Sequence, residues 1–431
     1  MKENRFASLN PSSLPGPEDI IRHPLKNGII TLIRPNPNSM TVAMAGYLPA
    51  GGLYEPEEKL GLANFTAEAL MRGTSRRTFG EIYEGLESMG ASLSFSGGTH
   101  TAGFAGKSLA NDLETLLEIL ADTLRNPVFP EMDLEKLRHQ FLIGLDLRSQ
   151  DTSEMASLTF DQVVFANHPY RHPEDGYPVT ISAITREDLV HFHNLHYGPG
   201  GMVIALAGAV QPQSVIDTLE RILGDWQNPR QPEIREVPDV DPPRERIRKH
   251  HVVEEKSQTD IVMGSIGPPR RAPAYMPARL GNSVLGQFGM MGRIGEAVRN
   301  RAGYAYYAYS SISSSIGPGT WTVSAGVDPK NLDQAIDLIQ REIERFVQEP
   351  VAEEELSDSQ SSYIGKLPLA LESNAGVAGS LLNIERHQLG LDYFQRYEQT
   401  IREVTSQDIL ETARQYLDPQ RLAIATAGPK Q

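Results

Sequence analysis

The hydrophobic pattern of the first hundred and fifty or so residues predicts strands interspersed with helices. Short apolar runs broken by proline are typical of strands, and apolar residues at helical spacing indicate helices packed on a core. The pattern predicts strands over 28–33 and 40–46, a strand or hairpin over 91–104, and helices over 60–71, from Asp112 and from Asp133. The elements lack a strict βαβ rhythm, so we expect an α+β fold with helices packed on one face of a largely antiparallel sheet.

The chain carries an internal repeat at an offset of 220 residues. Residues 184–189 (Ile-Thr-Arg-Glu-Asp-Leu) precede the apolar run 204–208, and residues 404–409 (Val-Thr-Ser-Gln-Asp-Ile) precede the run 424–428. Each pair is typical of a helix capped by threonine and followed by a short buried strand. A second pair of helical patterns, in 111–124 and 331–346, stands at the same offset. The repeat therefore predicts two similar domains.

The boundary between these domains follows from composition. Residues 227–249 are rich in proline, arginine and glutamate and have almost no apolar periodicity, which is typical of an exposed linker. The predicted organisation is an N-terminal extension over 1–16, a first domain over 17–228, a linker over 229–249 and a second domain over 250–429.

Composition excludes several kinds of chemistry. The 431 residues include no cysteine, which rules out disulfides, zinc ribbons and thiol catalysis. The formal net charge of −15 disfavours nucleic acid as a partner, because phosphate binding needs a positive field.

The sequence also bears on membranes and location. No stretch approaches the ~18 apolar residues of a membrane span. The first residues, Met-Lys-Glu-Asn-Arg, lead into a segment without the apolar region of a secretory signal. We therefore expect a cytoplasmic protein, with the mature form of a secreted precursor as the alternative.

Residues 51–74 contain the first recognisable motif. Gly61-Leu62-Ala63 and the later Gly73-Thr74 frame a helix that resembles the active-site helix of the pitrilysin/insulinase family of zinc peptidases, the inverzincins. In that family the motif His-x-x-Glu-His follows Gly-Leu-Ala. The two histidines bind zinc from one helical face, and the glutamate activates the bound water.

In this chain the corresponding positions are degenerate. Asn64, Ala67 and Glu68 replace the histidine, the glutamate and the second histidine, and Gly144 stands where the family's remaining glutamate ligand is expected. Asparagine is a poor zinc ligand, and one glutamate cannot hold the metal alone. We therefore expect no metal in this chain.

A second motif lies in the predicted second domain. Residues 286–306 resemble the family's Arg-x6-Tyr motif, with Arg299 and Tyr306 at the matching positions. The resemblance implies that the arginine binds the substrate backbone and that the tyrosine hydroxyl steadies the carbonyl oxygen during catalysis. The alternative is that Arg299 caps or pairs at a helix end and that Tyr306 is a half-buried strand residue.

Together these features imply that the two domains form one half of a clamshell-shaped enzyme and that the zinc ion is bound by a partner subunit. They resemble the zinc-less subunit of heterodimeric family members, which supplies the Arg/Tyr pair to a homologous subunit carrying His-x-x-Glu-His and zinc. We expect the substrate to be a peptide or unfolded polypeptide that pairs with an edge strand around Ser94, Phe95 and Ser96. The alternatives are a structural or interaction subunit, or a peptide-binding protein, without any hydrolytic role.

Overall fold

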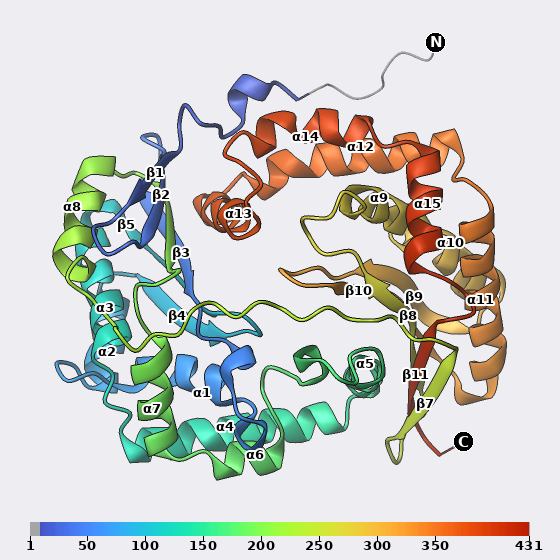
Figure 1. Cartoon of the computed structure of the whole chain (residues 1–431), viewed down its shortest axis with the longest axis horizontal. Helices are drawn as coiled ribbons and strands as arrows, with labels where there is room; N and C mark the ends of the chain where they lie inside the picture. Colours follow the sequence, from blue (N-terminus) through green and yellow to red (C-terminus); the bar gives the residue numbers. More distant parts are fainter. Residues whose placement is uncertain (1–8, 431) are drawn as a thin grey trace.

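The computed structural model describes residues 9–430, and its strands form two separate sheets (Figure 1). The first sheet has six strands: β1 (Ile21–Pro24), β2 (Ile30–Pro35), β3 (Thr41–Leu48), β4 (Ser92–Gly97), β5 (Ala102–Leu109) and β6 (Val203–Gly208). The helices of this half of the chain are α1 (Leu62–Ala69), α2 (Phe79–Ser88), α3 (Leu113–Arg125), α4 (Glu131–Ser149), α5 (Thr152–Val164), α6 (Pro178–Ala183), α7 (Arg186–His196) and α8 (Pro212–Leu223).

The second half repeats this plan. Its five strands are β7 (Ile247–Val252), β8 (Thr259–Gly267), β9 (Ala305–Ile312), β10 (Gly319–Val327) and β11 (Ala423–Gly428). Its helices are α9 (Tyr275–Gly286), α10 (Phe288–Ile294), a π-helical turn η7 (Gly295–Arg301), α11 (Leu332–Gln348), α12 (Glu353–Ala370), α13 (Asn374–His387), α14 (Tyr393–Arg402) and α15 (Ser406–Tyr416).

Both sheets are largely antiparallel and have matching strand orders. The orders are β1-β2-β6-β3-β5-β4 and β7-β11-β8-β10-β9. Each sheet holds one parallel pair, β2 with β6 and β7 with β11. The edge strands β4 and β9 therefore occupy equivalent places in the two halves, and the predicted α+β fold of two similar units is confirmed.

The repeated helix starts are alike in detail. The hydroxyl groups of Thr185 and Thr405 each accept a hydrogen bond from the backbone N–H of the aspartate three residues later. The carboxylate of that aspartate accepts the backbone N–H of the threonine in return. This reciprocal capping satisfies two N–H groups that a helix end leaves free. Each capped helix is followed by a fully buried strand, β6 or β11, as the repeat predicts.

The two halves exchange a helix. Most helices of the first half pack against one face of the first sheet, but α5 leaves this core and packs on the second sheet through Ala156, Phe160 and Val164. In return α13 packs on the other face of the first sheet through Val377 and Leu381. Each sheet is thereby covered on its second face by one helix from the opposite half.

The first residue of each exchanged helix also bonds to the opposite sheet. The Thr152 hydroxyl at the start of α5 donates to the buried carboxylate of Asp260 in β8. The Asn374 amide at the start of α13 donates to the Thr41 carbonyl oxygen in β3 at 3.0 Å. These bonds add directional contacts to the apolar packing of the two helices.

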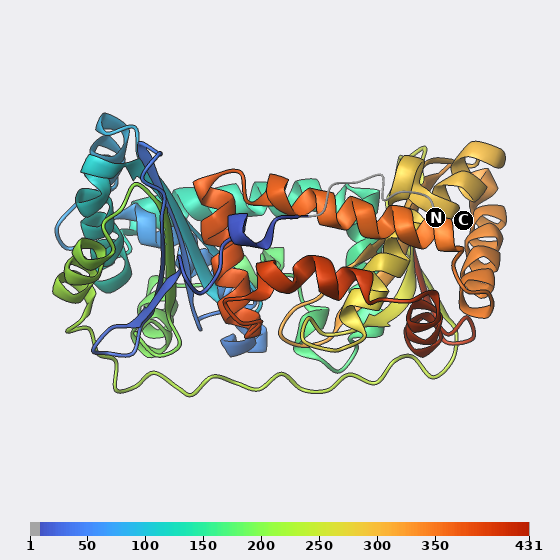
Figure 2. The same ribbon diagram turned by 90° about the horizontal axis from the view of Figure 1, so that it is seen from above.

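The segment between the halves runs along the outside of the molecule, as Figure 2 shows. Residues 227–246 form no helix or strand, and β7 starts within the last three residues of the predicted linker. The segment is nevertheless anchored, because the Arg235 guanidinium donates to the Leu53 carbonyl at 2.6 Å and lies over the Tyr54 ring.

The predicted N-terminal extension reaches across to the second half. Its residues 1–8 lie outside the described part of the chain. Leu14 is buried in the second core, and the Leu9 N–H donates to the Glu398 carboxylate at 2.7 Å, whereas β1 joins the first sheet. Across residues 9–430, no helix combines the length and the apolar character that crossing a membrane requires.

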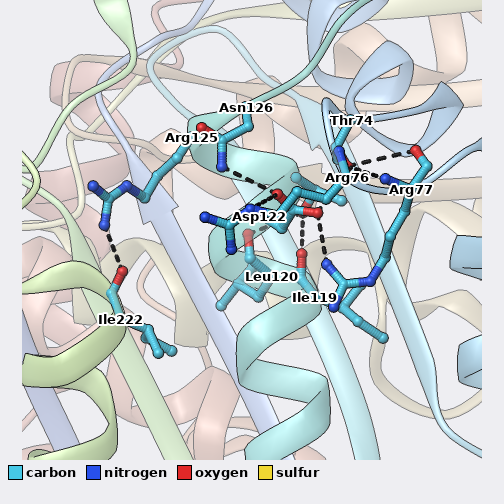
Figure 3. A network of polar contacts seen from close by, with 10 residues as sticks. Thr74, Arg76, Arg77, Ile119, Leu120, Asp122, Arg125, Asn126 and Ile222 are labelled. Atoms are coloured by element: carbon cyan, nitrogen blue, oxygen red, sulfur yellow. Dashed lines mark hydrogen bonds and ion pairs between the residues drawn. The ribbon is translucent and has the colours of Figure 1, made fainter.

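A buried carboxylate fixes the loop that follows α1. The Asp122 side chain in α3 is only 2% exposed and accepts bonds from Thr74 Oγ1 at 2.7 Å and from the Arg77 guanidinium at 2.6 Å (Figure 3). The Asn126 amide donates to its other oxygen at 3.1 Å. Because a buried charge is stable only when it is paired and hydrogen-bonded, this network holds the Gly73-Thr74 turn against the core.

We expect Asp122→Ala to lower the free energy of unfolding of the first half by ~3 kcal/mol, because it leaves Arg77 and Thr74 without their acceptor. Urea unfolding followed by circular dichroism measures this loss. The matched control is Asp225→Ala, which removes an exposed partner of Arg125 and should leave the unfolding midpoint unchanged. Equal midpoints for the two variants would contradict the role given to Asp122.

Candidate functional site

The helix that corresponds to the family's zinc helix begins at an unusual turn. Gly61 precedes α1 with a φ of +95°, and a side chain there would meet the Ile181 side chain at 2.6 Å, so glycine is required. The Glu55 carboxylate then accepts the N–H groups of Gly61 at 3.0 Å and Ala63 at 2.5 Å. Burial raises the pKa of Glu55 to about 7, and these two bonds oppose the rise.

Asn64 joins α1 to the edge strand β4. Its side-chain oxygen accepts the N–H of Gly97, the last residue of β4, at 2.8 Å. A side chain at Gly97 would meet the Asn64 Cα at 2.4 Å, so helix and strand approach closely at this point. The residue at the first metal-ligand position therefore has a structural bond, and its oxygen is occupied.

The residues at the other three degenerate positions do not make up a set of metal ligands. Ala67 is fully buried in the core, and Glu68 is half-buried, with burial raising its pKa and Arg72 lowering it. Gly144 is exposed on α4, and no atom lies within 4 Å of the point where its Cβ would stand. Within the described residues 9–430, no three histidine, cysteine or acidic side chains are grouped as a metal site requires.

Arg299 lies in the π-helical turn η7, which follows α10 directly. Such turns are rare and occur often at functional sites. Two nearby arginines are paired: Arg293 with Glu355 at 2.5 Å and Arg301 with Glu296 at 2.8 Å. In the described part of the chain, the Arg299 side chain has no such acceptor and is half-buried.

Tyr306 is the second residue of the edge strand β9 and is 70% exposed. Its hydroxyl forms no hydrogen bond within residues 9–430. The alternative interpretation from the sequence, a half-buried strand residue, is wrong about its burial, because the side chain is exposed. The next residue, Tyr307, differs: its hydroxyl donates to Asp260 at 2.5 Å, and burial raises its pKa. Tyr306 therefore offers a phenol without a hydrogen bond in the described part of the chain, and it lies seven residues after Arg299 in the sequence.

The structure does not bring the two motifs together. Helix α1 and strand β4 belong to the first half of the chain, whereas η7 and β9 belong to the second (Figure 1). The degenerate zinc positions and the Arg/Tyr pair are therefore carried by different sheets of the chain.

The predicted peptide-binding strand is an edge strand. Within residues 9–430, β4 pairs with β5 alone, so its outer backbone groups before Gly97, whose N–H donates to Asn64, are open to another strand. Ser94 and Ser96 point to solvent, whereas the Phe95 ring is buried against Phe104 with 6.0 Å between ring centroids. Any contact that Phe95 makes with a peptide must therefore come from its backbone.

Two family models match the chain. Residues 30–164 match "Insulinase (Peptidase family M16)", and residues 183–363 match "Peptidase M16 inactive domain". The chain belongs to the M16 peptidase family. The resemblance to active members of the family implies a zinc ion at positions 64, 67, 68 and 144. The residues found there, Asn64, Ala67, Glu68 and Gly144, do not fit a zinc ion.

Several known proteins are similar over most of the chain. The uncharacterized zinc protease YmxG of Bacillus subtilis is 24% identical over 355 residues, which are 82% of this chain and 85% of that protein. The M16 inactive domain from Pseudomonas fluorescens superposes with a TM-score of 0.89 at 23% identity, covering 96% of this chain and 98% of that chain. The periplasmic protease PqqL from Escherichia coli gives a TM-score of 0.81 at 13% identity, and the match covers 99% of this chain but 48% of that chain.

Two features of the site were not predicted from sequence. Glu55 had a usable signal, because a carboxylate shortly before a helix is stabilised by the free N–H groups at the helix start. The π-helical turn at Arg299 had none, since a helical pattern in the sequence does not distinguish i→i+5 from i→i+4 hydrogen bonds.

We expect the purified chain to hold no stoichiometric zinc, and we expect Asn64→His, Ala67→Glu and Glu68→His together to bind zinc only weakly. Adding Gly144→Glu to this triple variant should increase zinc affinity, because α4 has space for the side chain and a third protein ligand completes the set. Elemental analysis after dialysis measures both results. About one tightly bound zinc per wild-type chain would contradict the assignment.

Proposed function

We propose that this chain is the zinc-less subunit of a heterodimeric metallopeptidase. One observation supports this most: within the described residues, Arg299 and Tyr306 have no ion pair or hydrogen bond, and the four metal-site positions of the same chain hold no ligand set. The partner is a homologous chain that carries His-x-x-Glu-His and zinc. The complex hydrolyses peptides or unfolded polypeptides, and we place it in the cytoplasm.

Two donors of this kind suit the charge that develops in peptide hydrolysis. The carbonyl oxygen of the scissile bond becomes negative, and a phenol and a guanidinium both donate hydrogen bonds to such an oxygen or to the neighbouring backbone. The exposed hydroxyl of Tyr306 and the unpaired guanidinium of Arg299 are free to do so. In this proposal Arg299 positions the substrate backbone, and Tyr306 contacts the reacting oxygen.

The substrate is held as an added strand. The outer edge of β4 has free backbone groups, and Ser94 and Ser96 project from it without bulk. Backbone pairing of this type selects an extended conformation and tolerates many sequences. It fits unfolded segments better than folded proteins.

The match with PqqL supports an enzyme built from two homologous units of this kind. This chain covers 48% of PqqL, so it corresponds to about half of that protease. A second homologous chain would supply the remaining half. Uniting the two half-sites is the function we assign to the heterodimer.

Assembly is the first test. We expect the chain and a zinc-bearing homologue from the same organism to co-elute in size-exclusion chromatography, and we expect the mixture to cleave an unfolded peptide that neither chain cleaves alone. If the two chains elute separately and the mixture gains no activity, the proposal fails.

The second test concerns Tyr306 in the assembled complex. Tyr306→Phe removes one donor and keeps the ring, so kcat should fall by roughly 10²–10³. Tyr309→Phe is the matched control, because Tyr309 is a partly exposed tyrosine on the same strand, and its kcat should stay at the wild-type value. A Tyr306→Phe complex with wild-type kcat would instead support the structural or interaction role without hydrolysis.

The third test separates binding from chemistry. Arg299→Ala should raise KM at least as much as it lowers kcat, because contacts to the substrate backbone act in the ground state as well. Arg301→Ala removes an exposed arginine of the same turn that pairs with Glu296, and its kinetics should not change. Steady-state kinetics on the two complexes provide the comparison, and equal KM values would argue against a binding role.

A further inference from the structure

Two arginines, one lysine and three tyrosines alternate in the second half of the chain, and none of them belongs to the edge strands β4 and β9. Arg270 lies over the rings of Tyr393 at 5.6 Å and Tyr275 at 4.3 Å. Arg279 lies over Tyr275 at 5.7 Å and Tyr363 at 4.5 Å. Lys366 lies over Tyr363 at 5.5 Å. We call these six residues the cation–tyrosine stack.

The stack has no counter-charge. Among the ion pairs of residues 9–430, none includes Arg270, Arg279 or Lys366. On helix α14, by contrast, Arg396 is paired with Asp392, the residue before the helix, and Arg402 with Glu398 of the helix itself. Three uncompensated positive charges in a chain of net charge −15 indicate a place for an anion.

The stack borders a pocket of about 220 Å³ between α9, α12, α13 and α14. Its wall includes the apolar side chains of Leu367, Ile384 and Phe394, which are all buried. Lys366 and Asn383 are exposed at its rim, so the pocket is open to solvent. An apolar wall beside cationic groups is suited to a ligand with one anionic group on an apolar body, and less suited to a strongly hydrated inorganic ion.

We propose that this pocket binds the C-terminal carboxylate of a peptide whose last residue is apolar. The guanidinium groups of Arg270 and Arg279, which lie over tyrosine rings, hold the carboxylate. Arg270 donates one N–H group to Tyr393 and Arg279 bonds to Tyr397, and because a guanidinium has five N–H groups, others remain for the ligand. The apolar side chain of the last residue lies against Leu367 and Phe394. The Tyr393 hydroxyl, which accepts a bond from Arg270 at 2.8 Å, still has its proton to donate.

The choice of a peptide as the source of the carboxylate rests on the proposed peptidase function. The site lies apart from the Arg299/Tyr306 pair and from β4, none of whose residues line the pocket. It would hold the end of a substrate or product and not the scissile bond.

Titration calorimetry on the full chain alone tests the proposal. The probes are acetyl-Gly-Gly-Leu as the free acid, the same peptide as the C-terminal amide, and N-acetylleucine. We expect the free acid to bind and the amide to bind about tenfold more weakly or worse, because the amide lacks the charge that the arginines hold. Raising the ionic strength should weaken binding of the free acid.

Variants locate the binding. Arg270→Gln and Lys366→Gln should each weaken binding of the free acid by about tenfold or more, since each removes a charge of the stack. The matched control is Arg271→Gln, because Arg271 is exposed, adjacent in sequence and not part of the pocket lining. Its affinity should equal that of the wild type, and circular dichroism checks that every variant is folded.

The outcomes separate this proposal from the heterodimer proposal. Equal binding of acid and amide, no binding of either, or weakening by Arg271→Gln alone would overturn the site. Binding of N-acetylleucine without binding of the peptide would overturn the peptide assignment. Because the assay needs neither the partner nor hydrolysis, failure of the heterodimer would leave its result standing, and failure here would leave the heterodimer tests unaffected.

Discussion

The exchange of α5 and α13 between the two sheets is the constraint on which the rest of the structure depends. Each helix buries its apolar residues on the sheet of the opposite half, and its first residue bonds to that sheet: Thr152 to Asp260, and Asn374 to Thr41. Separating the halves would expose an apolar helix face and an apolar sheet face on each side, which costs free energy in proportion to the area exposed. The exchange therefore fixes the half that holds α1 relative to the half that holds η7 and β9. In the proposed heterodimer, the second chain places the metal beside Tyr306.

Equivalent positions of the two halves carry different residues. Thr152 and Asn374, the first residues of the exchanged helices, stand 222 residues apart, and Gly144 and Lys366 have the same separation. The second half thus has a cation at the place equivalent to the missing acidic ligand. Where an active first half would gather carboxylate and imidazole groups around a metal, this second half gathers arginine, lysine and tyrosine. The same helical framework supports a cation site in one sequence and an anion site in the other.

Much of the fold could be predicted because local and repeated signals agree. The threonine-capped helices at Thr185 and Thr405 and the apolar runs after them lie where the repeat places them. The hairpin β4–β5 follows from the alternation over residues 91–104. The exchange of helices could not be predicted, because the apolar face of α5 is the same whichever sheet covers it. The cation–tyrosine stack was also missed, since its residues come from three separate segments and have no characteristic spacing.

A distance across the assembled enzyme tests the central claim most directly. The chain has no cysteine, so a single cysteine can carry a spin label at position 306 or, in a separate sample, at position 144. With Mn²⁺ in the metal site of the partner, pulsed electron paramagnetic resonance measures the distance from each label to the metal. The account predicts that the label at Tyr306 is the closer of the two, because the Arg/Tyr half-site faces the partner's metal. A label at Gly144 that is equally close or closer would contradict it.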